Sequence, residues 1–385
     1  MPTYASRLAA LKSRQNALLN RANPAVKHDD FGLFQRREHP ILTAAHVPVA
    51  WRYDFDEATN PYLLERMGIN AVFNAGAIHH DGQFTVCARV EGDDRKSFFA
   101  LADSDDGVQR FRFRDHPLYL EPNDEHETNH YDMRLTRHAD GWIYGTFCVE
   151  RKDTTTDDLS AAVAQCGIVR TRDLDTWERL PDLVTPSAQQ RNVVVHPEYV
   201  DGKYMLYTRP QDGFINVGGG GGIGIGFCES MERAEITEET VLEPRRYHTV
   251  TEGKNGQGPA PLRTERGWIH LAHGVRNTAA GLRYVLYCFV TDLDDPTRVI
   301  RRPMGHVLAP RRDERTGDVS NVAFSNGWIL HDDTVYLYYG ASDTRLHVAT
   351  CALPALVDWC FHTPEDTLTT WGNNRLRRAL IERNG

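Results

Sequence analysis

The chain has 385 residues, of which 41% are hydrophobic and 25% are charged, with a formal net charge of −9. This acidic balance argues against general binding to nucleic acid or to an anionic membrane. The sequence contains no run of about 18 apolar residues, so no transmembrane helix is expected. The start of the chain lacks the basic and apolar pattern of a signal peptide.

Residues 4–22 place leucines among arginine, lysine and glutamine at roughly helical spacing, up to Pro24. This pattern predicts an amphipathic N-terminal helix within residues 1–24. We expect it to pack on the rest of the chain or on another subunit, and in the second case the helix would help to form the expected homo-oligomer. At the other end, residues 353–385 predict a C-terminal helical extension. No long linker divides the chain, which indicates a single domain over residues 1–385.

A short signature recurs five times, with a polar turn placed before alternating aromatic and aliphatic residues. Asp-Gly before such a run is typical of a β-hairpin, because glycine accepts a positive φ without steric cost. The turn positions lie 59 to 66 residues apart, a period that predicts the blades of a propeller. The fold class is therefore all-β, a five-bladed β-propeller with helical extensions at both ends. The turn positions are Gly82, Gly141, Gly202, Gly267 and Asp333.

Charged and polar residues gather where the hairpin strands are expected to end. A single arginine after a strand is usually a solvated strand end, but equivalent ends of all blades converge on one face of a propeller. A basic cluster there, inside an acidic protein, predicts a local anion site. The segments are Arg89-Val90-Glu91-Gly92, Tyr131-Asp132-Met133-Arg134 at the entry to the second hairpin, Arg209-Pro210, His273-Gly274 and Asp343-Thr344-Arg345.

Five stretches carry a resemblance to a known family. They are Tyr131-Asp132-Met133-Arg134, Gln190-Arg191-Asn192-Val193-Val194, Tyr207-Thr208-Arg209-Pro210, Gly253-Lys254-Asn255-Gly256-Gln257-Gly258-Pro259 and Gly317-Asp318-Val319-Ser320-Asn321-Val322. Over nearly its whole length the chain resembles glycoside hydrolase family 130, the inverting β-mannoside phosphorylases, which fold as five-bladed propellers. Three further stretches, residues 41–46, 90–98 and 273–277, resemble the members that act on 4-O-β-D-mannosyl-D-glucose.

The resemblance implies a role for each matching residue. Asp132 corresponds to the catalytic general acid, whose proton is thought to reach the leaving group through a sugar hydroxyl. The positions that hold inorganic phosphate correspond to Arg191, Arg209, Lys254, His273 and Tyr284. The substrate-binding positions correspond to Asn74, Arg89 and Asp343 around the mannosyl ring, to Tyr131 beside them, and to Arg95 at the glucose acceptor.

The implied reaction converts 4-O-β-D-mannosyl-D-glucose and phosphate to α-D-mannose 1-phosphate and D-glucose, with inversion at C1. An inverting hydrolase needs a second carboxylate to activate water, whereas phosphate is already an anionic nucleophile and needs a cationic pocket in line with C1. Phosphate is then a co-substrate, and no cofactor is expected. The alternatives are a β-1,4-mannooligosaccharide phosphorylase, a β-mannoside hydrolase on the same fold, and a non-enzymatic sugar-binding propeller.

Two other motifs and the cysteines bear on whether the chain has a metal site, a nucleotide-binding loop or disulfides. His126-Glu127-Thr128-Asn129-His130 matches H-E-x-x-H, but that zinc motif works only on a helix and its flanks are poor helix formers, so no metal site is expected. The glycine run 218–222 lacks the ending of a phosphate loop and predicts a flexible loop or a close backbone approach. Seven widely spaced cysteines favour reduced core thiols. We expect a cytoplasmic enzyme whose partners are the disaccharide and phosphate.

Overall fold

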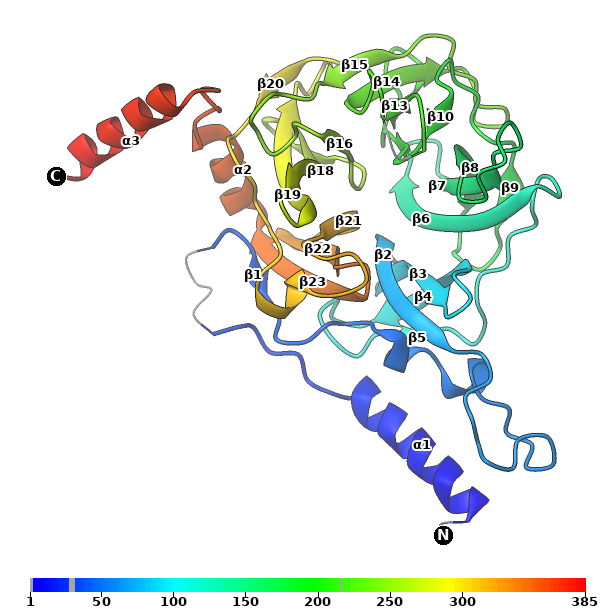
Figure 1. Ribbon diagram of the computed structural model, residues 1–385. Coiled ribbons are helices and arrows are strands. Elements are labelled where there is room, and N and C mark those ends of the chain that lie inside the picture. Colours follow the sequence, from blue (N-terminus) through cyan, green and yellow to red (C-terminus); the bar gives the residue numbers. More distant parts are fainter. Residues whose placement is uncertain (1–2, 28–31, 215–216) are drawn as a thin grey trace.

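The computed structural model describes residues 3–27, 32–214 and 217–385. Five antiparallel blades are arranged around a central axis, and within each blade the strands lie side by side outward from the axis (Figure 1). The predicted five-bladed propeller is therefore confirmed. The first two blades are β2 (Ile69–His80), β3 (Gln83–Gly92), β4 (Ser97–Ser104) and β5 (Arg112–Phe113), then β6 (Glu127–Arg137), β7 (Ile143–Lys152), β8 (Ala162–Thr171) and β9 (Glu178–Leu180).

The third and fourth blades depart from the plain four-stranded pattern. In blade 3 the inner strand is divided, so that its two parts pair with different partners. In blade 4 an extra short strand, β17 (Leu262–Thr264), pairs with the start of β18. Blade 3 comprises β10 (Gln189–Gln190) paired with β13 (Pro210–Gln211), and the sheet β11 (Val194–Val195), β12 (Tyr204–Thr208), β14 (Ile223–Cys228) and β15 (Thr240–Glu243); blade 4 comprises β16 (Lys254–Gln257), β18 (Gly267–Thr278), β19 (Gly281–Thr291) and β20 (Val299–Arg301).

The fifth blade closes the ring with a strand from the opposite end of the sequence. β21 (Ala323–His331), β22 (Thr334–Ala341) and β23 (Arg345–Ala352) are followed on the outside by β1 (Gln35–Arg36), which pairs antiparallel with β23. The Arg36 side chain then forms a buried ion pair with Glu314 at 3.2 Å, and the Tyr339 hydroxyl donates to the same carboxylate at 2.6 Å. The N-terminal part of the chain therefore fastens the last blade.

The recurring signature forms the turn between the inner strand and its neighbour in every blade. In blades 1 and 3 both central residues have positive φ, 47° and 77° at Asp81 and Gly82 and 51° and 78° at Asp201 and Gly202. Two positive φ values are the geometry of the type I′ turn that Asp-Gly favours. These turns all lie at one end of the propeller. The opposite end is formed by segments that connect one strand of a blade to the next.

Hydrophobic clusters fill the spaces between neighbouring blades. Val86 of blade 1 packs with Tyr338 and Val348 of blade 5, and similar clusters lie at the other blade boundaries. All seven cysteines are buried and free, as the sequence predicted. The core therefore lies between the sheets and leaves the central axis to the polar residues of the inner strands.

The terminal helices lie outside the propeller. α1 (Tyr4–Leu19) and α3 (Thr370–Asn384) extend away from it and bury none of their residues, whereas α2 (Leu353–His362) buries Leu356 and Cys360 (Figure 1). The predicted helices are confirmed, and α1 half-buries one face, which includes Leu8, Leu11 and Leu18, while the Gln15 side chain bonds to the backbone of Val47 and Val49. Short 3₁₀ turns occur at η1 (Ala44–His46), η2 (Val49–Trp51) and η3 (Arg312–Arg315).

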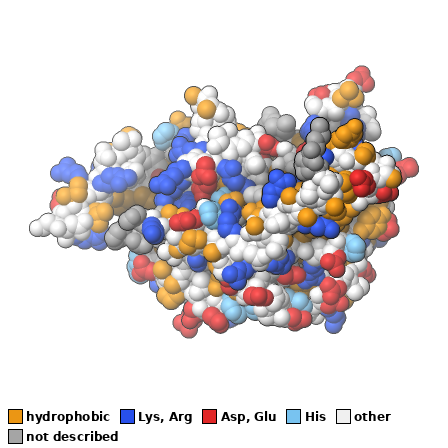
Figure 2. Space-filling model, turned by 90° about the horizontal axis from the view of Figure 1, so that it is seen from below, with side chains coloured by type: hydrophobic (Ala, Val, Ile, Leu, Met, Phe, Trp, Pro, Cys, Tyr) orange, Lys and Arg blue, Asp and Glu red, His pale blue; other side chains and the backbone are white. Residues whose placement is uncertain are grey.

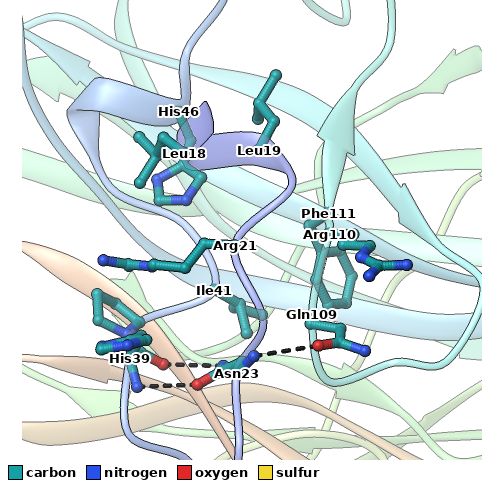
Figure 3. A pocket seen from close by; sticks show the side chains of 11 residues that line it. Leu18, Leu19, Arg21, Asn23, His39, Ile41, His46, Gln109, Arg110 and Phe111 are labelled. Carbon is teal, nitrogen blue, oxygen red and sulfur yellow. Dashed lines mark hydrogen bonds between the residues drawn. The ribbon is translucent and has the colours of Figure 1, made fainter. Parts of the chain in front are cut away.

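Asn23 ties the segment after α1 to blade 1. Its amide nitrogen donates to the carbonyls of His39 and Val108 at 3.0 Å each. Its backbone N–H donates to the side chain of Gln109 at 3.1 Å, and Figure 3 shows the bonds to His39 and Gln109. Figure 2 shows basic and acidic side chains interspersed over one side of the molecule, with hydrophobic side chains scattered among them. In the described part of the chain, no helix is long and apolar enough to cross a membrane.

Candidate active site

Breaks in the inner strands bring Asn74 and Asp132 together. β2 loses its register between Phe73 and Gly76, and β6 loses its register between Tyr131 and Arg134. At the breaks Asn74 and Asp132 adopt left-handed backbone conformations, with φ of 46° and 61°. Asparagine and aspartate tolerate this conformation better than other residues that have a side chain, and a bulge re-aims side chains. The local sequence thus turns one polar side chain of each blade toward its neighbour.

Asp132 is buried, with 7% of its surface exposed, and it is held by two donors on one oxygen. The amide of Asn74 donates to Oδ1 at 3.1 Å, and Nη1 of Arg89 lies 3.4 Å from the same atom. Arg89 is itself fixed by Ser97 at 2.9 Å and Glu91 at 2.7 Å. Among the described residues no hydrogen bond reaches Oδ2 of Asp132, so that oxygen is available to a substrate.

Asp343 adds a second carboxylate to this part of the site. It follows β22 in a left-handed conformation, with φ of 51°. Burial, and then the charge of Asp132, raise the pKa of Asp343 to about 7, while nearby Arg89 opposes the shift. A carboxyl group with this pKa can donate or accept a proton at neutral pH. Blades 1, 2 and 5 therefore supply an acidic half of the site.

Blades 3 and 4 supply a cationic half. Nη1 of Arg209 lies 3.4 Å from Nε2 of His273, and the Nζ of Lys254 lies 5.8 Å from the centre of the Tyr284 ring. The ring centres of His273 and Tyr284 are 6.1 Å apart. None of the carboxylates in the described residues forms an ion pair with Arg191, Arg209 or Lys254. Burial opposes a raised pKa at Arg191, but nearby groups that include Asp132 raise it. No carboxylate of the described residues, however, is in ion-pair contact with the cluster.

Burial and the closeness of the other cations lower the pKa values of two of these residues. Burial, and then the neighbouring Arg209 and Arg191, lower the pKa of Lys254 to about 7. Burial, and then Arg191, lower the pKa of Arg209 to about 9. Groups that depress one another's pKa values in this way are stabilised by an anion bound between them. The electrostatics indicate an anion site.

His273 contributes a neutral donor to this cluster. Burial, and then Arg209, hold the pKa of His273 well below its usual value. Because Arg209 donates to Nε2, the proton of the neutral ring belongs on Nδ1, which has no hydrogen-bond partner among the described residues. A Cβ atom on Gly256 would lie 2.5 Å from this ring, so glycine is required opposite it. The sequence predicted His273 at the end of a strand, but the structure places it within β18.

Tyr131 and Arg191 lie between the two halves. The guanidinium carbon of Arg89 is 4.6 Å from the centre of the Tyr131 ring, and that of Arg191 is 5.7 Å away. The Tyr131 hydroxyl is buried without a partner among the described residues, and burial raises its pKa well above the usual value. Tyr131 and Asp132 lie inside β6, the inner strand of blade 2 and the first strand of its hairpin, so the chain enters the second hairpin through this segment.

An open cleft of about 650 Å³ leads out from this boundary. Arg89, Tyr131 and Arg191 line it at the inner end, and Arg95 lines it in the turn after β3, where Arg95 is exposed with φ of 68°. The structure thus brings ten of the eleven predicted site residues into one region around the inner strands and places Arg95 at its entrance.

Arg134 was not assigned a role from the sequence, although it belongs to a segment that was singled out. It is 1% exposed and donates to the carbonyl of Asp132 at 2.7 Å, to the side chain of Asn192 at 2.6 Å and to the carbonyl of Gly258 at 3.2 Å. One guanidinium therefore joins the inner segments of blades 2, 3 and 4. Asn192, with φ of 58°, was also missed, and its position after Arg191 parallels that of Asp132 after Tyr131.

The H-E-x-x-H segment lies on strand β6 and the turn before it, and not on a helix. Glu127 bonds to His130 at 2.5 Å and to Arg151 at 3.0 Å. Residues four apart on an extended chain are about 13 Å apart, too far for two histidines to bind one metal ion. Within the described ranges, no group of three or more histidine, cysteine or acidic side chains has the arrangement of a metal site.

Comparisons with known proteins agree with this geometry. A family model described as beta-1,4-mannooligosaccharide phosphorylase matches residues 36–362. Over its whole length the chain is 56% identical to a 4-O-beta-D-mannosyl-D-glucose phosphorylase of Bacteroides fragilis, covering 99% of that protein. It is 26% identical, over 81% of its length and 90% of the relative, to a beta-1,4-mannooligosaccharide phosphorylase of Ruminococcus albus. A solved beta-1,2-mannobiose phosphorylase of Listeria innocua shares the fold, with a TM-score of 0.68, 21% identity, and coverage of 88% of this chain and 99% of that one.

Proposed function

The chain belongs to glycoside hydrolase family 130, and from this premise we propose that it is an inverting phosphorylase of 4-O-β-D-mannosyl-D-glucose. Its products are α-D-mannose 1-phosphate and D-glucose. The relative from Bacteroides fragilis, at 56% identity over the whole chain, supports this choice of substrate. In the proposed enzyme, residues 1–385 form one catalytic domain.

One observation supports phosphorolysis above all others. Arg191, Arg209 and Lys254 converge beside His273 without a carboxylate partner among the described residues, and burial, followed by neighbouring positive charge, lowers the pKa values of Lys254 and Arg209. A water nucleophile would leave this charge uncompensated, whereas phosphate would neutralise it. Arginine adds planar, paired donors that match phosphate oxygens.

In the proposed reaction a phosphate oxygen attacks C1 of the mannosyl ring from the face opposite the glucose. The bond between C1 and O4 of glucose breaks, and the proton of Asp132 reaches O4, either directly or through a sugar hydroxyl. Asn74 and Arg89 orient Asp132 through Oδ1. Arg209, Lys254 and the other cationic residues hold phosphate in line with C1, and this positioning is a large part of catalysis when the nucleophile is already charged.

The residues at the sugar are proposed to act as the family resemblance implies. Asp343 and Asn74 contact the mannosyl ring, Tyr131 in the cleft contacts the substrate, and Arg95 at the mouth of the cleft contacts the glucose. The cationic side chains meet the charge of phosphate, so the reaction as proposed needs no cofactor. The exposed Trp371, Leu380 and Ile381 of α3 support a homo-oligomer, and the seven free, buried cysteines support a cytoplasmic location.

Two alternatives have specific support. The description of the matching family model favours longer β-1,4-mannooligosaccharides as substrates. The second carboxylate, Asp343, with its raised pKa, is the group that a hydrolase would need to activate water.

One experiment separates these functions. The protein is incubated with mannosylglucose, mannobiose and mannotriose, with and without phosphate, and the products are identified by chromatography. We expect phosphate-dependent cleavage of mannosylglucose that yields α-mannose 1-phosphate, with slower cleavage of the other two. Equal turnover without phosphate, with release of free mannose, would establish the hydrolase instead. The Asp132→Asn variant, expected to be inactive, excludes a contaminating enzyme.

A further inference from the structure

The glycine run 218–222 contacts both blades that carry the phosphate cations. It precedes β14, and residues 219–222 lie beside Pro210 and Arg245 around a hollow of about 440 Å³. The sequence suggested either a flexible loop or a close backbone approach for this run. The structure shows a close approach, and it occurs next to residues of the cationic half of the site.

Gly221 joins the two blades through its own backbone. Its N–H donates to the carbonyl of Pro210 at 2.8 Å, and its carbonyl accepts from the N–H of Asn255 at 2.8 Å. Pro210 directly follows Arg209, and Asn255 directly follows Lys254. A single residue therefore links the main chain beside the arginine of blade 3 to the main chain beside the lysine of blade 4.

Only glycine fits this link. A Cβ atom on Gly220 would lie 2.1 Å from the carbonyl oxygen of Pro210, and one on Gly221 would lie 2.6 Å from the side chain of Val217. Gly221 also has φ of 87°, a conformation that residues with side chains rarely adopt. We call Gly220 and Gly221 the glycine bridge.

Arg245 fastens the same junction from the side. Its Nη1 donates to the carbonyl of Gly253 at 3.1 Å, and its Nη2 donates to the carbonyl of Gly218 at 3.2 Å. Gly253 precedes Lys254, so one planar guanidinium connects the glycine run to the start of β16. Lysine keeps the charge but lacks the rigid fork that reaches two carbonyls at once.

We propose that the glycine bridge, clamped by Arg245, is a positioning element that sets the separation of Arg209 and Lys254 for the binding of inorganic phosphate. The inference rests on the proposed function, because it assigns the two cations to phosphate. The bridge does not contact the reacting atoms. It acts through the main chain on which the two cations are mounted.

Three alanine variants test the proposal. Gly220→Ala and Gly221→Ala break the bridge, whereas Gly219→Ala is the matched control, because its Cβ would meet nothing within 4 Å and its φ is not positive. Phosphate binding is measured by titration calorimetry with inorganic phosphate, and initial rates give KM for phosphate and for the disaccharide. We expect the Kd and KM for phosphate to rise by about 10- to 100-fold in the bridge variants, with the disaccharide KM and the control unchanged.

Arg245→Lys is the milder test if the bridge variants fail to fold, and Arg246→Lys, on the neighbouring residue of the same hollow, is its control. We expect a smaller rise in the phosphate Kd for Arg245→Lys and none for Arg246→Lys. Folded variants of the bridge and of Arg245 that bind phosphate as tightly as the unaltered protein would overturn the proposal. So would an equal loss of disaccharide affinity, which indicates a general structural role.

The two proposals fail in different ways. If the unaltered protein cleaves mannosylglucose equally well without phosphate, the proposed function is wrong, yet calorimetry still compares phosphate binding among the variants and decides the role of the bridge. If the unaltered protein binds no phosphate at all, both proposals are overturned. Thermal melting of each variant confirms that it is folded at the assay temperature.

Discussion

Lys254 should make phosphate binding sensitive to pH in the neutral range. Burial, and then Arg209 and Arg191, lower its pKa to about 7. The protonated fraction in the free enzyme therefore falls from about nine-tenths at pH 6 to about one-tenth at pH 8. Bound phosphate favours the charged lysine, so binding at the higher pH requires uptake of a proton. If only the charged form binds, the apparent affinity falls about tenfold across this range.

The control is Lys254→Arg, because arginine keeps its charge at both pH values. Phosphate itself and Asp343 titrate in the same range, and the variant reports their contributions without that of Lys254. The measured quantity is the KM for phosphate of the unaltered protein divided by that of Lys254→Arg, from initial rates at pH 6, 7 and 8 with saturating disaccharide. We expect this ratio to rise about tenfold from pH 6 to pH 8.

A ratio that stays constant over this range would refute the reasoning, because it would mean that Lys254 does not change its charge. Lys254→Met is a second check in case arginine does not fit. Without a titrating group at this position, phosphate binding should be weak at both pH values and should follow only the ionisation of phosphate and of Asp343. Calorimetry in two buffers of different ionisation enthalpy would count the proton taken up at pH 8.

Asp132→Asn should lower kcat by about 10²- to 10⁴-fold and leave phosphate affinity by calorimetry unchanged, because the amide cannot donate the acid proton; a folded variant with normal rates would exclude Asp132 as the acid. Arg209→Ala should instead raise the KM for phosphate, as rates against phosphate concentration would show. Treatment with a chelator should not alter the rate, since Glu127 holds His130 on a strand; loss of activity restored by zinc would contradict this. A chain without α1 should form an assembly of fewer subunits than the full chain, as the mass measured by light scattering divided by the mass of one chain would show. An unchanged number of subunits would count against a role for α1 in assembly.

The hairpin turns explain why the fold could be predicted from the sequence. Asp81-Gly82 and Asp201-Gly202 form their turns through local backbone preference alone, so the chemistry of two residues marks each blade. The spacing of the turns then gives the number of blades. The closing strand β1 could not be predicted in this way, because its pairing with β23 joins residues over 300 positions apart and has no local signal.

The residues of the site divide in the same manner. Asp132, Arg209 and Lys254 stand in distinctive segments, and the resemblance to the family assigned them. Arg134 was missed because its three acceptors lie in three blades and two of them are backbone carbonyls, which no sequence pattern reveals. The role of Gly221 was missed for a related reason. A glycine run indicates that the main chain comes close to another segment, but only the fold shows which segment that is.

The division of the site between the blades bears on the choice of nucleophile. In blades 1 and 2 the inner strands place Asn74 and Asp132 at the breaks, so that polar groups hold a carboxylate with one free oxygen. In blades 3 and 4 the inner segments carry Arg191, directly after β10, and Lys254, at the start of β16. The inner segments of the blades thus present an acid on one side of the axis and cations on the other. A sugar bound between them has a proton donor at one face and positive charge at the opposite face, which is the arrangement that inversion by an anion requires and that water does not use.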